Sequence, residues 1–248
     1  LGGAAHYWGR LGDDAIGDRI VADLAREGVD VGAVRRVPGG ASPSTAILIA
    51  DDGERLVCTF TDPGLGADPS WLPLDRVPSF DAVMTDVRWP EGAARVLDAA
   101  RRAGRIAVFD GDLGPVAALQ DLARRATHVA FSEPGLACAS GAALPGEGLR
   151  RMAQETAAWV GVTLGAGGLL WLDGGTERRE PAPTVKAVDT LGAGDVWHGA
   201  FTLALAEGKA VDAAARFANT AAAIKCTRFG GRGGAPRRDE VEAALAAH

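Results

Sequence analysis

Residues 188–195 read Val188-Asp189-Thr190-Leu191-Gly192-Ala193-Gly194-Asp195 and lead directly into an apolar-periodic stretch from Val196 to Glu207. Three small residues before an acidic one let the backbone approach a phosphate group closely. The helix that begins there points unpaired N–H groups and the positive end of its dipole at that phosphate. The segment therefore predicts a phosphate-binding turn at a helix N-terminus, with Asp195 facing the reacting hydroxyl group.

Two common nucleotide-binding motifs are absent. The sequence contains no G-x-x-x-x-G-K-[ST], and Gly192 to Trp197 lacks the third glycine of a dinucleotide fingerprint. The alternative interpretation of Asp195 is a stabilising aspartate at a helix N-terminus. The flanks favour the functional interpretation, because Lys186–Val188 is predicted as a short strand and the following segment has apolar residues at helical spacing up to Gly208.

Composition describes an ordinary globular protein. The length of 248 residues is compatible with one large α/β domain over residues 1–248, and 47% hydrophobic with 23% charged residues is an ordinary globular balance. The net charge of −6 comes without a basic stripe, so we expect no nucleic-acid partner. The three cysteines, Cys58, Cys138 and Cys226, lie far apart in the sequence and are predicted to be reduced thiols. The absence of a long apolar run predicts a cytoplasmic protein without a membrane partner.

Strand-like and helix-like stretches alternate along most of the chain. This alternation predicts a layered α/β fold with a mostly parallel sheet. An early helix with an apolar face at Ile16, Ile20, Val21 and Leu24 is closed by Gly28. The predicted strands are 4–9, 82–86, 106–110, 128–132 and 160–164, and further helices are predicted at 91–103 and 116–125.

One passage interrupts the alternation. Two strand-like runs, 46–50 and 55–60, flank the sequence Asp51-Asp52-Gly53-Glu54. An Asp-Gly turn between two such runs predicts a β-hairpin.

The run that ends at Asp195 resembles the D-T-x-G-A-G-D signature of the PfkB carbohydrate kinase family, the ribokinase-like enzymes. The resemblance implies a three-layer α/β/α sandwich with a mostly parallel central sheet and a small β lid, here at about 30–61. In that family the lid covers the sugar and often makes the contact of a homodimer. It also implies that Asp195 is the catalytic base, and that an anion hole is formed by Gly192, Ala193 and Gly194.

The beginning of the chain matches only part of the family pattern. The family's first strand and its Gly-Gly-Asn segment are absent, whereas Gly9-Arg10-Leu11-Gly12-Asp13-Asp14 resembles its G-x-x-G-D-D ending. We expect about fifty residues to be missing from the N-terminus, judging from the usual length of such one-domain α/β proteins. The resemblance makes Asp13 a candidate substrate-binding residue.

A second glycine-rich segment resembles the family's ATP site. Thr163-Leu164-Gly165-Ala166-Gly167-Gly168 matches its T-x-G-x-x-G sequence, although glycine clusters also mark ordinary turns. The resemblance implies that ATP is bound by Thr163, Gly165, Gly167, Thr190, Asn219 and Gly230.

The family also has a monovalent cation site beside the anion hole. Four residues fall at or near its positions, which makes K⁺ a candidate cofactor: Asp189, Leu191, Lys225 and Arg228. A lysine at this place can supply its own ammonium group instead of potassium. The alternative interpretation of 223–231 is a helix C-terminus with basic residues that complement the dipole.

One motif departs from the family. The expected N-x-x-E near Mg²⁺ is replaced by Ser132-Glu133-Pro134-Gly135, while ATP chemistry still implies Mg²⁺. Arg88 follows a predicted strand, where ligands bind in open α/β sheets, and is a candidate for binding an anionic substrate group or else a surface arginine. Asp110 and Asp112 are further candidates near the phosphates, and His198 is expected to be buried.

These observations predict an ATP-dependent kinase that phosphorylates a hydroxyl group of a small sugar. The wording around Arg88 and 225–232 is most similar to the sulfofructose kinase and ketohexokinase side of the family, which favours a ketose or a sulfosugar. The alternatives are a nucleoside kinase and a non-catalytic sensor that binds a nucleotide or sugar. An NAD-dependent dehydrogenase fits the α/β alternation but lacks the glycine fingerprint.

Overall fold

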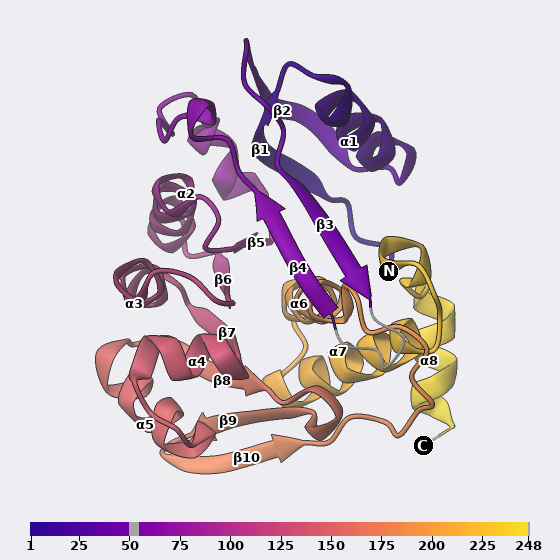
Figure 1. The fold of residues 1–248 in the computed structure, drawn as a ribbon. Helices are drawn as coiled ribbons and strands as arrows, with labels where there is room; N and C mark the ends of the chain where they lie inside the picture. Colours follow the sequence, from indigo (N-terminus) through magenta and orange to yellow (C-terminus); the bar gives the residue numbers. More distant parts are fainter. Residues whose placement is uncertain (50–54, 248) are drawn as a thin grey trace. The chain divides into compact units, whose positions relative to one another are not determined.

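The computed structural model describes residues 1–49 and 55–247. Its packing separates two compact units, which are described one at a time (Figure 1). The large unit comprises Leu1–Gly2 and Leu74–His248, and the small unit comprises Gly3–Pro73. A single kinase domain over 1–248 stays a prediction.

The large unit is built on a six-stranded sheet with the order β10-β9-β8-β7-β6-β5. Strands β5 to β8 are parallel, with Ala82 paired to Ile106 and Val108 paired to His128, whereas β9 and β10 are antiparallel additions at one edge. Because the four parallel strands run the same way, their carboxyl ends share one edge of the sheet. The strands are β5 (Ala82–Thr85), β6 (Ile106–Gly111), β7 (His128–Ser132), β8 (Trp159–Thr163), β9 (Leu169–Asp173) and β10 (Thr176–Glu180).

Helices cover both faces of this sheet (Figure 1). One layer contains α2 (Pro90–Arg102), α3 (Val116–Arg125), α4 (Glu133–Ser140) and α5 (Pro145–Glu155). The other contains α6 (Ala193–Ala206) and α7 (Val211–Cys226), with α8 (Arg238–Ala246) packed against α7. Short 3₁₀ turns occur at Leu74–Ser79, Gly165–Gly167 and Gly231–Gly234. The three-layer α/β/α sandwich with a mostly parallel sheet is therefore confirmed.

The core beneath α6 and α7 explains why these two helices lie so close to each other and to the sheet. Their facing positions carry small side chains that are fully buried, among them Ala200, Ala204, Ala214 and Ala218. Small residues let helix backbones approach, and Phe201 then fills the remaining space, stacked on Trp197 with ring centroids 4.8 Å apart. Burying one such aromatic side chain stabilises the fold by roughly 1.5–3 kcal/mol.

The small unit contains two pairs of strands. β1 (His6–Gly12) and β2 (Asp30–Val37) are parallel and are joined by α1 (Ala15–Arg26). β3 (Ser44–Ile49) and β4 (Arg55–Phe60) are antiparallel, with Ala46 opposite Cys58. The 3₁₀ turn Pro63–Leu65 follows. Both strands of the predicted hairpin are present, and its predicted turn at 51–54, like residue 50, lies outside the described residues.

Several predicted elements differ from the structure. Lys186–Val188 is not a strand: the N–H groups of Val188 and Asp189 donate to the Cys226 carbonyl at 2.7 and 3.2 Å, so this backbone pairs with a helix end instead of a sheet. The helix predicted from Val196 begins at Ala193, and the first strand is His6–Gly12 instead of 4–9. The antiparallel pair β9 and β10 was not predicted, because its polar second strand has no apolar alternation.

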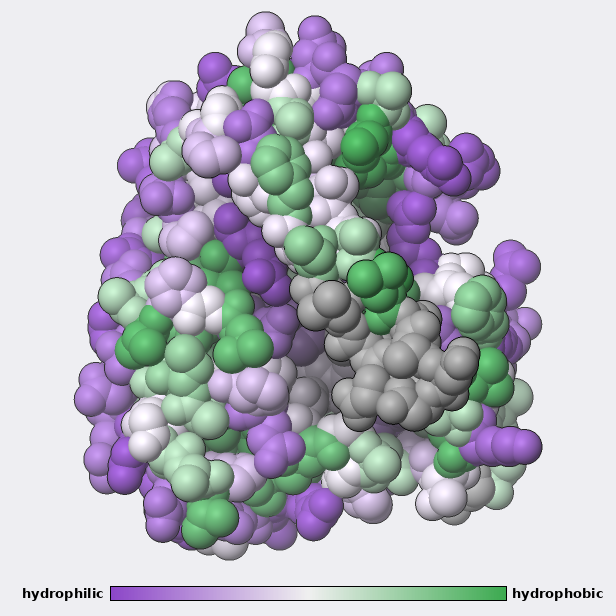
Figure 2. Space-filling view, viewed as in Figure 1, coloured by the Kyte–Doolittle hydropathy of each residue, from purple (hydrophilic) through white to green (hydrophobic). Residues whose placement is uncertain are grey.

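The surface mixes polar and apolar residues. Figure 2 shows both kinds interspersed over the face in view. None of the helices within residues 1–49 and 55–247 combines the length and the apolar character that crossing a bilayer requires.

Candidate active site

The glycine turn before α6 leaves backbone donors beside a carboxylate. Gly192 has φ +77°, a left-handed conformation that favours glycine, and α6 begins at the next residue. The N–H of Ala193 donates to the Thr190 carbonyl at 3.2 Å, whereas the N–H groups of Gly194 and Asp195 lie in the first turn, where a helix supplies no partner. Gly194 and Asp195 are both exposed. The open donors therefore belong to Gly194 and Asp195 more than to the predicted Ala193.

Asp189 fixes the segment that precedes this turn. Its carboxylate accepts from the N–H of Leu191 at 2.9 Å and from the N–H of Gly230 at 3.0 Å. These bonds, with Lys225 as a smaller contribution, lower the pKa of Asp189 to about 2. Asp189 therefore stays ionised and ties 189–191 to the loop after α7.

The residues predicted to form a monovalent cation site are only partly together. Lys225 is fully buried with its ammonium nitrogen 2.8 Å from the Asp189 carbonyl oxygen. The Arg228 guanidinium instead pairs with Glu240 of α8, and the Leu191 side chain is exposed. The structure thus brings together Asp189, Lys225 and the Arg228 carbonyl, which is 3.5 Å from the Lys225 ammonium nitrogen, whereas the side chains of Leu191 and Arg228 do not take part.

A group of carboxylates gathers at the carboxyl ends of β5 and β6. Asp110 is 17% exposed at its side chain, with an oxygen 3.4 Å from Nε2 of the buried His198. Burial raises the pKa of Asp110 to about 6; His198 opposes this shift, and Asp112, Asp86 and Asp195 add to it by repulsion. Burial also raises the pKa of Asp86. We call Asp86, Asp110, Asp112 and Asp195 the acidic edge.

Arg88 lies against this acidic edge. Its backbone N–H donates to Asp86 at 2.9 Å, and its Nη2 donates to an Asp112 oxygen at 3.3 Å. The side chain is 67% exposed, so much of the guanidinium stays open to a ligand. The arrangement is compatible with either an anion-binding arginine or a surface ion pair.

The segment that departs from the family pattern has a clear local role. Ser132 ends β7 and caps α4, accepting from the Gly135 N–H at 3.0 Å, and its hydroxyl donates to Asp112 at 2.9 Å. Glu133 is exposed. The capping role of Ser132 has a recognisable signal in the sequence, a serine three residues before a first-turn N–H, whereas no local signal indicates its bond to Asp112.

The predicted ATP-binding residues occupy three places in the large unit. Thr163 ends β8 and is followed by the glycine-rich turn, in which Gly165 is exposed. Gly168 has φ +80°, and a Cβ there would lie 2.1 Å from the Glu180 carbonyl oxygen, so only glycine fits. Thr190 and Gly230 are both exposed. Thr190 follows Asp189 in the sequence, and the Gly230 N–H donates to the Asp189 carboxylate.

Asn219 has its amide engaged within the protein. Its Oδ1 accepts from Trp197 Nε1 at 2.7 Å, and its Nδ2 donates to the carbonyls of Glu180 at 2.9 Å and Pro181 at 3.3 Å. The residue is 3% exposed. These bonds give Asn219 a structural role in joining α7 to α6 and to the segment after β10, and its contact with a nucleotide stays a prediction.

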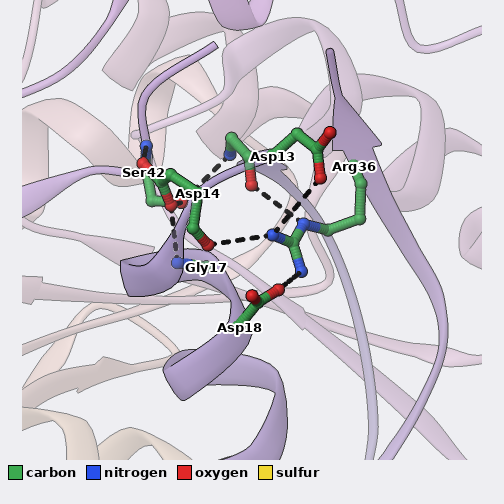
Figure 3. A network of polar contacts seen from close by, with 7 residues as sticks. Asp13, Asp14, Gly17, Asp18, Arg36 and Ser42 are labelled. Carbon is green, nitrogen blue, oxygen red and sulfur yellow. Dashed lines mark hydrogen bonds and ion pairs between the residues drawn. The ribbon is translucent and has the colours of Figure 1, made fainter. Parts of the chain in front are cut away.

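In the small unit, Asp13 lies next to a polar network (Figure 3). Asp14 caps α1 by accepting from the Gly17 N–H and also accepts from the backbone and hydroxyl of Ser42, each at 2.7 Å. The Ser42 bonds contribute most to lowering the pKa of Asp14 to about 2. Arg36 donates to the carbonyl oxygens of Gly12 and Asp14, whereas the exposed Asp13 is 3.9 Å from it. Asp13 thus lies beside a hydrogen-bonded network with its carboxylate largely exposed.

The described part of the chain holds no cluster of three or more His, Cys, Asp or Glu arranged as a metal cage. Mg²⁺ is commonly bound by one or two carboxylates together with nucleotide phosphates and water. The acidic edge has that chemistry, because it supplies several carboxylates at the ends of β5 and β6 and at the start of α6. Burial is the main cause of the raised pKa of Asp110, and repulsion by Asp112, Asp86 and Asp195 adds to it. The residues present therefore fit a magnesium ion that is bound together with ATP.

Comparison with known proteins identifies the family. The profile described as "pfkB family carbohydrate kinase" matches residues 1–238. The chain belongs to this family. The predicted class, an ATP-dependent carbohydrate kinase that uses Mg²⁺, is confirmed at this level.

Individual relatives agree with this assignment. Ribokinase of Bacillus subtilis is 30% identical over 251 residues, which cover 99% of this chain and 83% of that enzyme. The crystal structure of a presumed ribokinase of Agrobacterium tumefaciens is 42% identical with a TM-score of 0.95, covering 100% of this chain and 82% of the other. Ribokinase of Thermotoga maritima is 26% identical with a TM-score of 0.83, covering 97% and 81%.

Proposed function

We propose that this protein transfers the γ-phosphoryl group of ATP to a hydroxyl group of a small sugar, with Asp195 as the base. The observation that carries the proposal is the exposed Asp195 carboxylate beside open first-turn N–H groups at the start of α6. Phosphoryl transfer depends mainly on positioning and on charge stabilisation. In this role the N–H groups of the glycine turn bind developing negative charge, and the Asp195 carboxylate accepts the hydroxyl proton.

The proton transfer has a definite timing. A carboxylate is a weak base toward an alcohol, whose proton becomes acidic only as the oxygen bonds to phosphorus. Asp195 therefore accepts the proton late, as the substrate oxygen bonds to phosphorus. Its other duty is to orient that oxygen, which matters because correct placement supplies much of the rate acceleration.

The acceptor that we favour is a ketose or a sulfosugar. The open guanidinium of Arg88 supports the ketose or sulfosugar predicted from the sequence, since a fork of N–H donors suits a sulfonate or phosphate. The ribokinase of Bacillus subtilis adds ribose to the candidates. The aminoimidazole riboside kinase of Salmonella typhimurium, 29% identical, keeps nucleosides as the alternative.

The test is ADP release with Mg-ATP against ribose, fructose, a sulfonated ketose and a set of nucleosides. A rate that depends on one sugar supports the kinase and identifies its substrate class. A rate with nucleosides alone makes the protein a nucleoside kinase. ATP binding by calorimetry without turnover on any acceptor would favour the non-catalytic sensor.

The hairpin β3/β4 supports the predicted lid and homodimer contact. Cross-strand pairing places Ala46, Leu48, Cys58 and Phe60 on one face, and all four are exposed, with Leu48 at 63% and Phe60 at 53%. Exposed apolar side chains on one face of a hairpin are suited to contact with a partner surface. Light scattering tests this: the wild type is expected to be a dimer and Leu48→Glu a monomer, whereas a monomeric wild type refutes the contact.

A further inference from the structure

A buried ammonium group lies beneath the glycine turn. Lys225, in the last turn of α7, is 0% exposed. Its Nζ is 2.8 Å from the Asp189 carbonyl oxygen, 3.5 Å from the Arg228 carbonyl oxygen and 3.6 Å from an Asp189 carboxylate oxygen. A buried charge is costly unless it is paired and hydrogen-bonded, so these oxygens form a site built for a cation.

The surroundings enclose the ammonium group. The Asp189 carboxylate that faces it also accepts from the Gly230 N–H at 3.0 Å, which holds the negative charge in place. Gly234 packs over the lysine stem, and a Cβ there would lie 3.3 Å from Lys225 Cε. Residues of the loop that follows α7 therefore enclose Lys225, with Gly230 bound to its counter-ion Asp189 and Gly234 against its stem.

The same oxygens are those that a potassium ion would need. A monovalent cation is held by backbone carbonyl and carboxylate oxygens, and the resemblance placed such a site among Asp189, Leu191, Lys225 and Arg228. Here the carbonyls of Asp189 and Arg228 already face Nζ. A second cation at these oxygens would be repelled by the ammonium group. The residues therefore do not fit an external K⁺.

We propose that Lys225 is a positioning residue whose ammonium group takes the place of an activating monovalent cation. It ties 189–191 to 228–231, and this second segment supports the glycine turn: a Cβ on Gly192 would lie 3.9 Å from the Gly231 carbonyl carbon. The consequence is a kinase whose activity does not require K⁺. The activity arm of this inference rests on the proposed function.

The first test compares cations at constant ionic strength. Wild-type activity with Mg-ATP and the accepted sugar is measured in tetramethylammonium chloride, with KCl, NH₄Cl or NaCl substituted stepwise. The wild-type rate is expected to stay unchanged. Saturable activation of the wild type by K⁺ would overturn the inference while leaving the kinase assignment intact.

Two substitutions at Lys225 separate charge from volume. Lys225→Ala removes the ammonium group and opens its space, so turnover is expected to fall by about a hundredfold as the loop loses its position. K⁺ or NH₄⁺, but not tetramethylammonium, is expected to restore part of it. Lys225→Met fills the space with an apolar chain and is expected to remain slow in every salt. Lys209→Ala, at an exposed lysine paired with Glu207, is the control for loss of a positive charge.

Thermal unfolding supplies a readout that needs no activity. K⁺ is expected to raise the Tm of Lys225→Ala and to leave those of the wild type and Lys225→Met unchanged, relative to tetramethylammonium. A K⁺-dependent Tm of the wild type would refute the inference. So would a folded Lys225→Ala that keeps wild-type turnover and ignores K⁺. If no acceptor gives turnover, the proposed function fails and the Tm comparison still decides the role of Lys225.

Discussion

Asp189 and the carboxylates of the acidic edge, all in the large unit, have opposite electrostatic surroundings. At the anchor of the glycine turn, Asp189 faces backbone N–H groups and the Lys225 ammonium, and its pKa is lowered to about 2. At the acidic edge, Asp110 is desolvated and faces other carboxylates, and its pKa is raised to about 6. One environment keeps its carboxylate ionised, and in the other burial and neighbouring carboxylates disfavour the ionised form of Asp110.

This difference distinguishes a carboxylate that stabilises the fold from carboxylates that are available to a ligand. A carboxylate whose oxygens are taken by N–H groups is a structural tie, because a ligand must break those bonds to use it. A cluster of crowded carboxylates gains from the arrival of a cation, a proton or a donor such as a sugar hydroxyl.

Replacing Asp195 by asparagine tests whether a carboxylate of the acidic edge acts in catalysis. We expect turnover to fall by about a thousandfold or more, because the amide accepts no proton, while ATP binding is retained. Steady-state kinetics and calorimetric titration with ATP measure the two effects. Asp212→Asn, which changes an exposed first-turn aspartate of α7, is the matched control and is expected to be active. Near-normal turnover of Asp195→Asn would remove Asp195 as the base.

Replacing Asp189 by asparagine tests the structural side. The amide presents N–H groups to donors that need an acceptor and leaves the buried Lys225 without its counter-charge, so a clear drop in Tm together with slower turnover is expected. Asp62→Asn is the control, since Asp62 also accepts from two backbone N–H groups but belongs to the small unit. If the Asp189 variant loses turnover and keeps its Tm, the residue belongs with the reactive group.

Asp110 has a pH signature of the opposite sign to Asp189. Its pKa is raised from 3.8 in the unfolded chain to about 6 in the folded one, so the folded state binds the proton more tightly. The free energy of unfolding therefore falls as the pH rises from about 4 to 6, by at most about 3 kcal/mol. Urea unfolding at several pH values is expected to show this fall in the wild type and a weaker one in Asp110→Asn. Asp239→Asn, on the exposed first turn of α8, controls for loss of a surface charge, and equal slopes in all three proteins would contradict the assignment.

Arg88 gives the smallest expected effect and sharpens the role of the acidic edge. Arg88→Ala is expected to raise the KM of an anionic sugar by about tenfold and to change that of a neutral sugar little, because one charge-assisted hydrogen bond contributes about 1.5–3 kcal/mol. Kinetics on a sulfonated and an unsubstituted ketose measure the difference. Arg95→Ala, on α2, is the control. Equal losses on both sugars would mean that Arg88 acts only through its ion pair with Asp112.

The parts of the fold that follow from local pattern were predicted well. The helix at Val116–Arg125 has its apolar residues at helical spacing, and the buried strands β6 and β7 are short apolar runs. The strand predicted at Lys186–Val188 was wrong, because the Val188 N–H donates to the carbonyl of Cys226, at the end of a helix 38 residues further along the chain. No local window contains that partner.

The candidate site divides in the same way. The sequence determined the family, the glycine turn and the place of Asp195, because these depend on residue types within eight consecutive positions and on the helix that follows. The tertiary structure alone decided that Lys225 reaches the Asp189 carbonyl, that Ser132 binds Asp112 and that His198 faces Asp110. These pairs are separated by 20 to 88 residues in sequence, and their protonation and burial depend on which side chains packing brings together. Sequence specifies the groups, and their distances and pKa values are properties of the folded chain.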